Sequence, residues 1–199
     1  MLRYCLLGIC LLVVSACTAE PVLNLEELEA NARGGDPQAI EQLVGLLASE
    51  EPGLSDRIYK MVVGIGERAI PALLSRVQNK NKQVREYVIA ALGTLKVVDA
   101  IPAISEVLAN KTLERRYVAA WALGDIGDAM AIPALLSALD DENSEVRRYA
   151  TRALIKLNRL AVMPLLDFLA EAEGEGSAAA IRALGDIADK RALDALLIQ

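Results

Sequence analysis

Histidine is absent from the 199 residues of the chain, which removes the commonest general base and the commonest metal ligand of proteins. The three cysteines all lie near the N-terminus, at Cys5, Cys10 and Cys17. The rest of the chain therefore has neither a disulfide framework nor a cysteine-ligated metal site. GxSxG, Walker A, GxGxxG and HExxH motifs are also missing. We therefore predict a protein that is not an enzyme, binds no metal and needs no cofactor.

Aromatic residues are scarce, at 4% of the chain, whereas alanine and leucine are abundant. This composition is typical of closely packed helices, because sheets favour β-branched and aromatic residues. The formal net charge is −6, and nucleic-acid binding requires a basic surface instead. We therefore predict an all-α protein that does not bind nucleic acid.

The N-terminal segment has the features of a secretory signal. One cation, Arg3, precedes an apolar run over residues 5–14. A helix needs about 20 apolar residues to cross a bilayer, so this shorter run fits a signal peptide better than a membrane span. The run ends in VSAC, residues 14–17, which resembles the lipobox of bacterial lipoproteins.

The lipobox resemblance implies cleavage before Cys17 and attachment of lipid to its thiol and its new amino group. Residues 1–16 would then be a lipoprotein signal peptide and residues 17–23 a lipidated tether, since several acyl chains on one residue give stable membrane anchoring. Thr18 follows the cysteine, and under the usual sorting rule of Gram-negative bacteria this implies the periplasmic face of the outer membrane. The alternative is an ordinary signal peptide cut near Ala16 or Ala19, with the cysteine incidental.

A period of 31 residues runs through the rest of the chain. Proline, a capping asparagine or threonine, and arginine each recur at this spacing. Three independent residue types that share one period indicate stacked supersecondary units. The recurring residues are Pro71, Pro102, Pro133 and Pro164; Asn81, Thr112 and Asn143; and Arg85, Arg116 and Arg147.

Each unit is predicted to contain two helices. The first, helix A, begins at an Ala-Ile-Pro motif such as residues 69–71, because proline is tolerated in the first turn of a helix. The second, helix B, follows the recurring asparagine or threonine, Thr112 among them, since both residue types are good N-caps. Gly93 and Gly124 fall late in helix B, where we expect them to allow close contact with a neighbouring helix.

This pattern resembles the HEAT repeats, specifically the short HEAT-like repeats of the bilin (PBS) lyases. The motifs that carry the resemblance are AIPALL at residues 131–136, VRRYATRAL at 146–154 and LGDIGD at 123–128. The resemblance implies an α–α superhelix, a solenoid of four to five helical-hairpin repeats whose B helices line the concave side.

In that family an acidic residue six positions before the helix-B arginine often pairs with it. Two of the three equivalent residues here are amides, so the resemblance implies a structural ladder of arginines that is hydrogen-bonded more than ionic. The expected pairs are Asn79 with Arg85, Asn110 with Arg116, and Asp141 with Arg147.

We expect the solenoid to span residues 24–199, with a capping helix first and a partial repeat last. An unpaired last helix would allow self-association at that end. The expected boundaries are 24–35 for the capping helix, 36–66, 67–96, 97–127, 128–158 and 159–189 for the repeats, and 190–199 for the partial repeat.

Candidate binding residues lie at the outward positions of the B helices. Tyr117 and Trp121 are one turn apart on the same helix face, and Arg148, Arg152 and Arg182 follow on the next two helices. Tryptophan, tyrosine and arginine are over-represented at interface hot spots. Two arrangements fit the sequence: Trp121 points into the groove as a binding residue, or it packs beneath Arg152 in a cation–π contact.

We therefore predict a lipid-anchored protein-interaction scaffold in the bacterial cell envelope. Its protein partner would be neutral to acidic where it meets the arginines and would offer an apolar group to Trp121. Two alternatives stay open. One is an accessory or chaperone-like subunit of an enzyme or of a chromophore-attachment (lyase-like) system, and the other is a structural envelope protein that assembles with itself.

Overall fold

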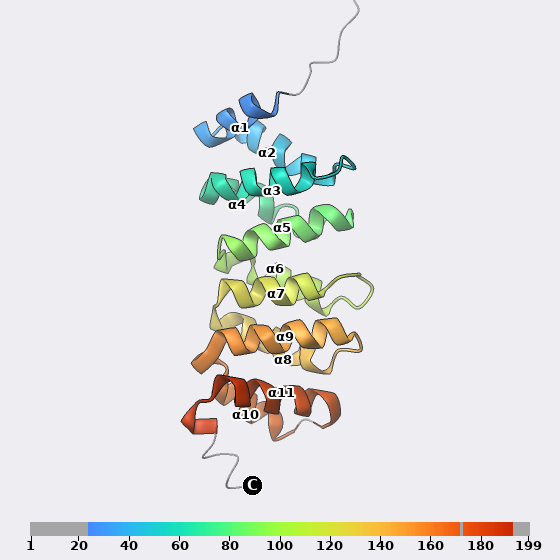
Figure 1. Cartoon of the computed structure of the whole chain (residues 1–199), viewed down its shortest axis with the longest axis vertical. Helices are drawn as coiled ribbons and strands as arrows, with labels where there is room; N and C mark the ends of the chain where they lie inside the picture. Colours follow the sequence, from blue (N-terminus) through green and yellow to red (C-terminus); the bar gives the residue numbers. More distant parts are fainter. Residues whose placement is uncertain (1–23, 172, 193–199) are drawn as a thin grey trace, which may run out of the picture.

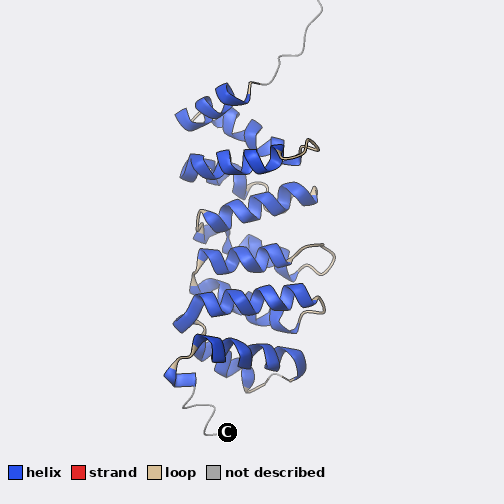
Figure 2. Cartoon of the chain, viewed as in Figure 1, coloured by secondary structure: helices blue, strands red, loops and turns tan. Residues whose placement is uncertain are grey.

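The computed structural model describes residues 24–171 and 173–192. Over these residues the regular structure is entirely helical, with eleven α-helices, six short 3-10 helices and no β-strand (Figure 2). The all-α class predicted from the sequence is therefore confirmed. The predicted signal peptide, Cys17 and the tether to residue 23 lie outside the described residues, as does most of the partial repeat predicted at 190–199.

The helices follow one another without long interruptions. The α-helices are α1 (Leu25–Gly34), α2 (Pro37–Gly45), α3 (Leu54–Ile65), α4 (Ile70–Leu74), α5 (Lys82–Thr94), α6 (Ile101–Ala109), α7 (Tyr117–Ile126), α8 (Ile132–Ser137), α9 (Ser144–Leu157), α10 (Val162–Leu169) and α11 (Gly174–Ile187). The 3-10 helices are η1 (Leu46–Ala48), η2 (Gly66–Ala69), η3 (Val98–Ala100), η4 (Ala129–Ala131), η5 (Ala138–Asp140) and η6 (Asn158–Leu160).

The helices stack in two layers along one axis, in the order of the sequence (Figure 1). We call α2, α4, α6, α8 and α10 the A layer, and α3, α5, α7, α9 and α11 the B layer. Successive B helices pack on one another, and each B helix also packs on the A helix that precedes it. This arrangement is the predicted α–α superhelix, in which each helix pair touches only its neighbours.

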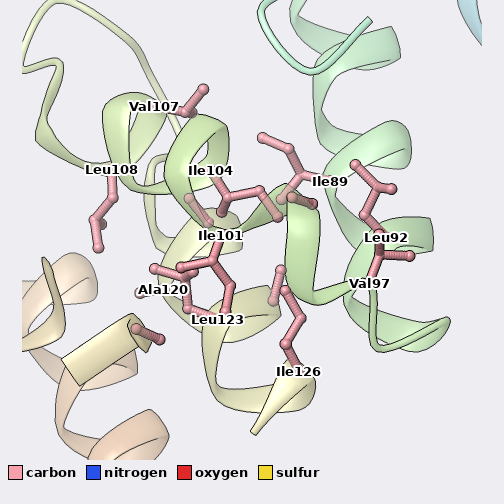
Figure 3. Close-up of a cluster of buried hydrophobic side chains, with 14 of the residues drawn as sticks. Ile89, Leu92, Val97, Ile101, Ile104, Val107, Leu108, Ala120, Leu123 and Ile126 are labelled. Carbon is pink, nitrogen blue, oxygen red and sulfur yellow. The ribbon is translucent and has the colours of Figure 1, made fainter. Parts of the chain in front are cut away.

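A single apolar core runs through the stack from Leu28 to Ala192. Around α5, α6 and α7 it contains Ile89, Ile104 and Leu123, each no more than 1% exposed (Figure 3). Burial of one such side chain contributes about 1.5–3 kcal/mol, and helices of neighbouring pairs pack on one another along the stack. No pair therefore completes its core alone.

Proline marks the start of most A helices. In α4, α6 and α8 it is the second residue of the helix, as expected for a residue without a backbone N–H. In α10 the helix begins at Val162, so Pro164 is the third residue. Val162 is buried like Ile132, and Met163 is exposed like Pro133. From the start of α8 to the start of α10, the structural repeat is thus one residue shorter than the others, although the spacing of the prolines stays constant.

The B helices approach closely at two glycines. A Cβ atom on Gly93 would lie 2.9 Å from both the Cα and the Cβ of Ala122. A Cβ atom on Gly124 would lie 2.7 Å from the Cβ and 2.8 Å from the Cα of Ala153. Only glycine fits these crossings without movement of a helix backbone. Gly185 has the equivalent position in α11 and has nothing within 4 Å of such a Cβ atom.

The prediction that Thr112 caps the third B helix is wrong. Residues 111–116 form turns, and α7 begins only at Tyr117. The Oδ1 atom of Asn110 accepts the backbone N–H of Thr112 at 3.1 Å and its hydroxyl at 2.7 Å, so this hydroxyl does not cap the helix. Arg115 has φ 53°, in the left-handed region that non-glycine residues rarely adopt. One helical turn is therefore missing at the start of α7.

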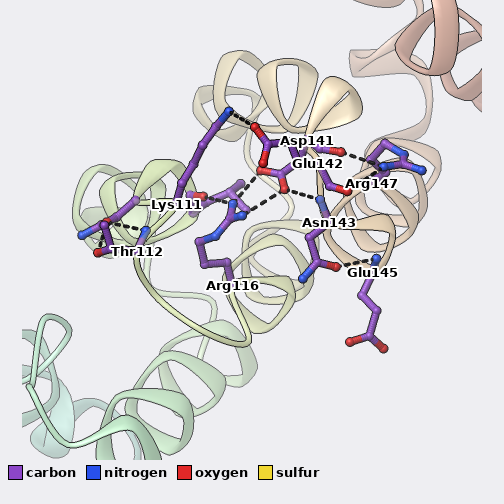
Figure 4. Close-up of polar contacts among 10 residues, drawn as sticks. Lys111, Thr112, Arg116, Asp141, Glu142, Asn143, Glu145 and Arg147 are labelled. Carbon is purple, nitrogen blue, oxygen red and sulfur yellow. Dashed lines mark hydrogen bonds and ion pairs between the residues drawn. The ribbon is translucent and has the colours of Figure 1, made fainter.

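The arginine ladder crosses between repeats, which corrects the expected pairing of Arg116 with Asn110. Nη1 and Nη2 of Arg116 donate to the two carboxylate oxygens of Asp141 at 2.6 and 2.9 Å (Figure 4). Nη1 also donates to the carbonyl of Leu108 at 2.9 Å. Both side chains of this ion pair are at most 8% exposed. A buried bidentate pair is strong because charge assists both hydrogen bonds.

The other two ladder arginines bond to backbone carbonyls. Nη1 of Arg85 donates to the carbonyl of Asn79 at 2.8 Å, and Nη1 of Arg147 donates to the carbonyl of Asp141 at the same distance. Nη2 of Arg147 also lies 3.7 Å from a carboxylate oxygen of Glu175 in the following repeat. The ladder therefore holds the turn between the A and B helices through main-chain atoms.

The glycine contacts lead to a prediction with opposite signs at two matched positions. Gly124→Ala should lower the free energy of unfolding by about 1–3 kcal/mol, since overpacking against a helix backbone outweighs the gain in helix propensity. Gly185→Ala meets open space and should raise it by about 0.5–1 kcal/mol. Urea denaturation followed by circular dichroism measures both. Equal effects at the two sites would contradict the close B-helix contact.

The buried ion pair leads to a second prediction. Asp141→Asn leaves the Arg116 guanidinium buried without a counter-charge, and we expect the free energy of unfolding at pH 7 to fall by about 3–5 kcal/mol. The matched control is Glu145→Gln, which removes an exposed pair with Arg148 at 3.4 Å and should cost less than about 1 kcal/mol. Urea denaturation at pH 7 measures both.

The same pair makes stability depend on pH. Burial acts to raise the pKa of Asp141, but the hydrogen bonds from Arg116 and from the backbone N–H of Asn143, together with the arginine charge, lower this pKa below its ordinary value. Such a carboxylate stabilises the fold above its unfolded pKa of about 3.9, and the contribution is lost as pH falls through the folded value. Below about pH 4, wild-type stability should fall more steeply than that of Asp141→Asn. Parallel pH profiles would contradict this.

Candidate functional site

Two neighbouring hollows open on the outer face of the B layer. The α7–α9 hollow has a volume of about 500 Å³, and the α5–α7 hollow has a volume of about 650 Å³. The α7–α9 hollow is lined by Tyr117, Val118, Trp121, Gly124, Asp125, Tyr149, Arg152, Ala153 and Lys156. The α5–α7 hollow is lined by Asn81, Lys82, Gln83, Glu86, Tyr87, Ala90, Arg115 and Val118.

Aromatic rings form one wall of the α7–α9 hollow. Tyr117 and Tyr149 stack with their ring centroids 5.0 Å apart and their planes at 27°. The guanidinium carbons of Arg148 and Arg152 lie 5.1 and 5.8 Å from the Tyr149 centroid, within the range of a cation–π interaction. Tyr149 is thus central to the site, although the sequence did not mark it as a binding residue.

Trp121, the single tryptophan of the chain, lines the α7–α9 hollow and is partly exposed. The cation–π contact with Arg152 is not present, because that guanidinium lies over Tyr149 instead. The indole ring does pack in part against the apolar core, so the structure combines features of both arrangements. Trp121 therefore offers part of its indole ring to the hollow.

The cations near the α7–α9 hollow differ in their partners. Lys156 Nζ donates to Asp125 Oδ1 at 2.6 Å, and Arg148 pairs with Glu145 on its own helix. Arg152 and Arg182 form no ion pair within residues 24–171 and 173–192. Four of the five predicted residues thus meet at or beside one hollow: Tyr117, Trp121, Arg148 and Arg152. Arg182 is exposed on α11, beyond the lining residues.

The α5–α7 hollow was not predicted, because it depends on the late start of α7. Arg115 reaches from the turn before α7 to Glu86, with Nη1 and Oε2 2.5 Å apart. Next to it the Tyr87 hydroxyl donates to Asp56 Oδ1 at 2.5 Å. This hydrogen bond, followed by burial and by the Asp56 charge, raises the pKa of Tyr87 to about 12, so its phenol is neutral at physiological pH.

Neither hollow has the side chains of a metal centre. In the described part of the chain, no three or more histidine, cysteine, aspartate or glutamate side chains are grouped to hold a metal ion. In the same residues, no helix has the length and apolar character needed to cross a membrane. The chemistry that the two hollows provide is aromatic contact, ion pairing and hydrogen bonding.

The profile of the HEAT repeats matches residues 40–123, 70–155 and 110–175, and the profile of the PBS lyase HEAT-like repeat matches residues 178–198. Together the first three matches span more than half of the chain. This chain belongs to the HEAT-repeat family. The resemblance to HEAT-like repeats predicted from the motifs is thereby confirmed. No curated protein matches the chain.

Solved structures share the fold of this HEAT-repeat protein. The complex of CpcE and CpcF of phycocyanin lyase from Nostoc sp. aligns with a TM-score of 0.59 at 23% identity, covering 73% of this chain and 98% of that one. Human deoxyhypusine hydroxylase in complex with glycerol aligns with a TM-score of 0.53 at 20% identity, covering 85% and 69%. At these identities the likeness extends to the fold alone.

Proposed function

We propose that this HEAT-repeat protein is a non-catalytic protein-interaction scaffold, and that its B layer binds a partner protein at the α7–α9 hollow. The observation that carries the proposal is the composition of this hollow: Trp121 and two stacked tyrosines line an open depression beside the guanidinium of Arg152, which has no ion-pair partner among the described residues. These residue types dominate interface hot spots. A stack of repeats also presents an extended surface suited to a peptide or a helix.

The chemistry of the hollow defines the partner that fits it. Arg152 lacks a carboxylate among the described residues, so a neutral or acidic group of the partner fits beside it. Trp121 and the Tyr117–Tyr149 pair supply apolar and aromatic area for an apolar side chain. Arg182 on α11 extends the cationic surface by one repeat.

A second candidate function is that of an accessory subunit in an enzyme or chromophore-attachment system. It is favoured by the fold shared with the CpcE–CpcF complex of phycocyanin lyase and by the match to the PBS lyase HEAT-like repeat. Binding of a bilin to the purified protein, followed by its absorption spectrum, would favour this function over the scaffold. Self-assembly into an envelope structure is the third alternative, and a crosslink between two copies would favour it.

We also propose that the protein is anchored in the bacterial cell envelope by lipid on Cys17, on the periplasmic face of the outer membrane. The support comes from the sequence: a short apolar run ends at this cysteine, and Thr18 follows it. A folded stack attached through a short tether would lie close to the membrane surface.

The partner-binding proposal predicts that Trp121→Ala weakens capture of the partner. Loss of a tryptophan hot spot costs about 2 kcal/mol or more, which is about a thirtyfold loss of affinity. Recovery of the partner in a pull-down should therefore fall strongly for Trp121→Ala combined with Arg152→Glu. The control is Arg159→Glu in η6, since this side chain is 85% exposed and lies outside both hollows.

A photoreactive amino acid at position 121 tests the same proposal in cells. We expect a crosslink to a different protein, because the indole position faces the α7–α9 hollow. A crosslink only to a second copy of the chain would support self-assembly instead. If the double variant recovers the same proteins as the wild type, the α7–α9 hollow is not the binding site.

The anchoring proposal predicts that Cys17→Ser releases the protein from membranes. Serine has no thiol to carry lipid, so the variant lacks the several acyl chains on one residue that stable anchoring requires. Membrane fractionation and metabolic labelling with a palmitate analogue measure the effect. The control is Cys10→Ser, which lies inside the predicted signal peptide and should leave labelling unchanged. Labelling that persists in Cys17→Ser would contradict the lipobox interpretation.

A further inference from the structure

Glu86, in the α5–α7 hollow, has a carboxylate that is only half satisfied. Its Oε2 atom accepts a hydrogen bond from Arg115 at 2.5 Å. Its Oε1 atom is buried and has no hydrogen-bond partner, and it is the one such side-chain atom among residues 24–171 and 173–192. A buried acceptor without a donor is destabilising, so a hydrogen-bond donor supplied to this atom would stabilise the protein.

Arg115 makes a weaker ion pair with Glu86 than the next residue, Arg116, makes with Asp141. Its side chain is 51% exposed and donates one hydrogen bond to Glu86, whereas Arg116 donates two to Asp141 and is buried. Its backbone lies in the left-handed region with φ 53°, within a segment that has lost its helical turn. The Arg115 guanidinium is therefore a half-exposed partner of a carboxylate that is itself 17% exposed and has one buried oxygen.

The other polar groups around the hollow are already paired. Lys82 bonds to Glu114, and Asp56 accepts the Tyr87 hydroxyl. With these pairs formed, the Oε1 atom of Glu86 is the buried acceptor of the hollow that has no donor among the described residues. The next hollow along the B layer, between α7 and α9, has the opposite character, because its Arg152 has no carboxylate partner among the described residues.

We propose that the α5–α7 hollow is a second subsite of the binding surface, and that it takes an arginine side chain of the partner, which displaces Arg115 and bonds to both oxygens of Glu86. A guanidinium matches a carboxylate with two parallel hydrogen bonds. Ala90, Val118 and the Tyr87 ring line the hollow beside the stem of that arginine. This inference rests on the proposed function, since the same partner occupies the α7–α9 hollow with an apolar and acidic group.

The distance between the two hollows determines the spacing in the partner. Packed helices lie about 8–10 Å apart, and the hollows are one B helix apart. A polyproline II segment advances about 3.1 Å per residue and returns to the same face every three residues. An extended partner therefore places its arginine about three residues from the acidic and apolar group that enters the α7–α9 hollow.

Labelled peptides test this inference directly. The probes are fluorescein-labelled proline-rich peptides that carry a Leu-Glu pair and one arginine, placed one to five residues away, and matched peptides with glutamine in place of arginine. Fluorescence anisotropy with the full chain in detergent measures their affinities. We expect tightest binding at a separation of three and at least about a tenfold preference for arginine over glutamine, the effect of one charged hydrogen bond.

Two variants should change the binding of arginine peptides in opposite directions. Glu86→Gln should abolish the preference for arginine, whereas Arg115→Ala removes the side chain that the partner displaces and should increase the affinity of arginine peptides by about three- to tenfold. Glu142→Gln is the control, since this glutamate is 86% exposed and lines neither hollow. Circular dichroism checks that each variant keeps its helical content.

The outcomes separate this inference from the proposed function. Binding that requires Trp121 but keeps its arginine preference in Glu86→Gln would overturn the subsite and leave the scaffold in place. Unchanged affinity in Arg115→Ala would also overturn the subsite. Failure of every peptide to bind the wild-type chain would overturn the subsite, whereas the scaffold is tested separately by the pull-down with Trp121→Ala and Arg152→Glu.

Discussion

The close stacking of the B helices is the contact on which the rest of the structure depends. Each helix pair buries only part of its apolar surface and relies on the next pair to cover the remainder. The helices come near enough for this because Gly93 faces Ala122 and Gly124 faces Ala153. With the helices at this separation, side chains one repeat apart meet across the B layer, and the two hollows form between them.

One irregular segment gives the regular stack its local chemistry. Asn110 accepts the N–H and the hydroxyl of Thr112, and α7 loses its first turn. The two arginines that follow then separate: Arg116 turns inward to Asp141 in the next repeat, and Arg115 turns outward to Glu86 in the previous one. The same six residues, 111–116, therefore tie three repeats together and cover one of the hollows.

Much of the fold was predictable because its signals are local or strictly periodic. Proline near a helix start and asparagine as an N-cap depend on a few neighbouring residues, so the positions of α5 and α9 follow from the sequence. The recurrence of these signals at one spacing indicated the stack. The shared face of Tyr117 and Trp121 followed from helix geometry alone, and the structure places both in one hollow.

The parts that were not predictable depend on residues brought together by stacking. The sequence by itself determined the helix pairs, their order and the outward face of each B helix, because these follow from spacing within one repeat. Only the tertiary structure decided that Asp141, 25 residues away, bonds Arg116, that Tyr149 stacks on Tyr117, and that Glu86 keeps one unbonded oxygen. These outcomes depend on the distance and rotation between neighbouring repeats, which side-chain packing sets to within fractions of an ångström and which no local pattern encodes.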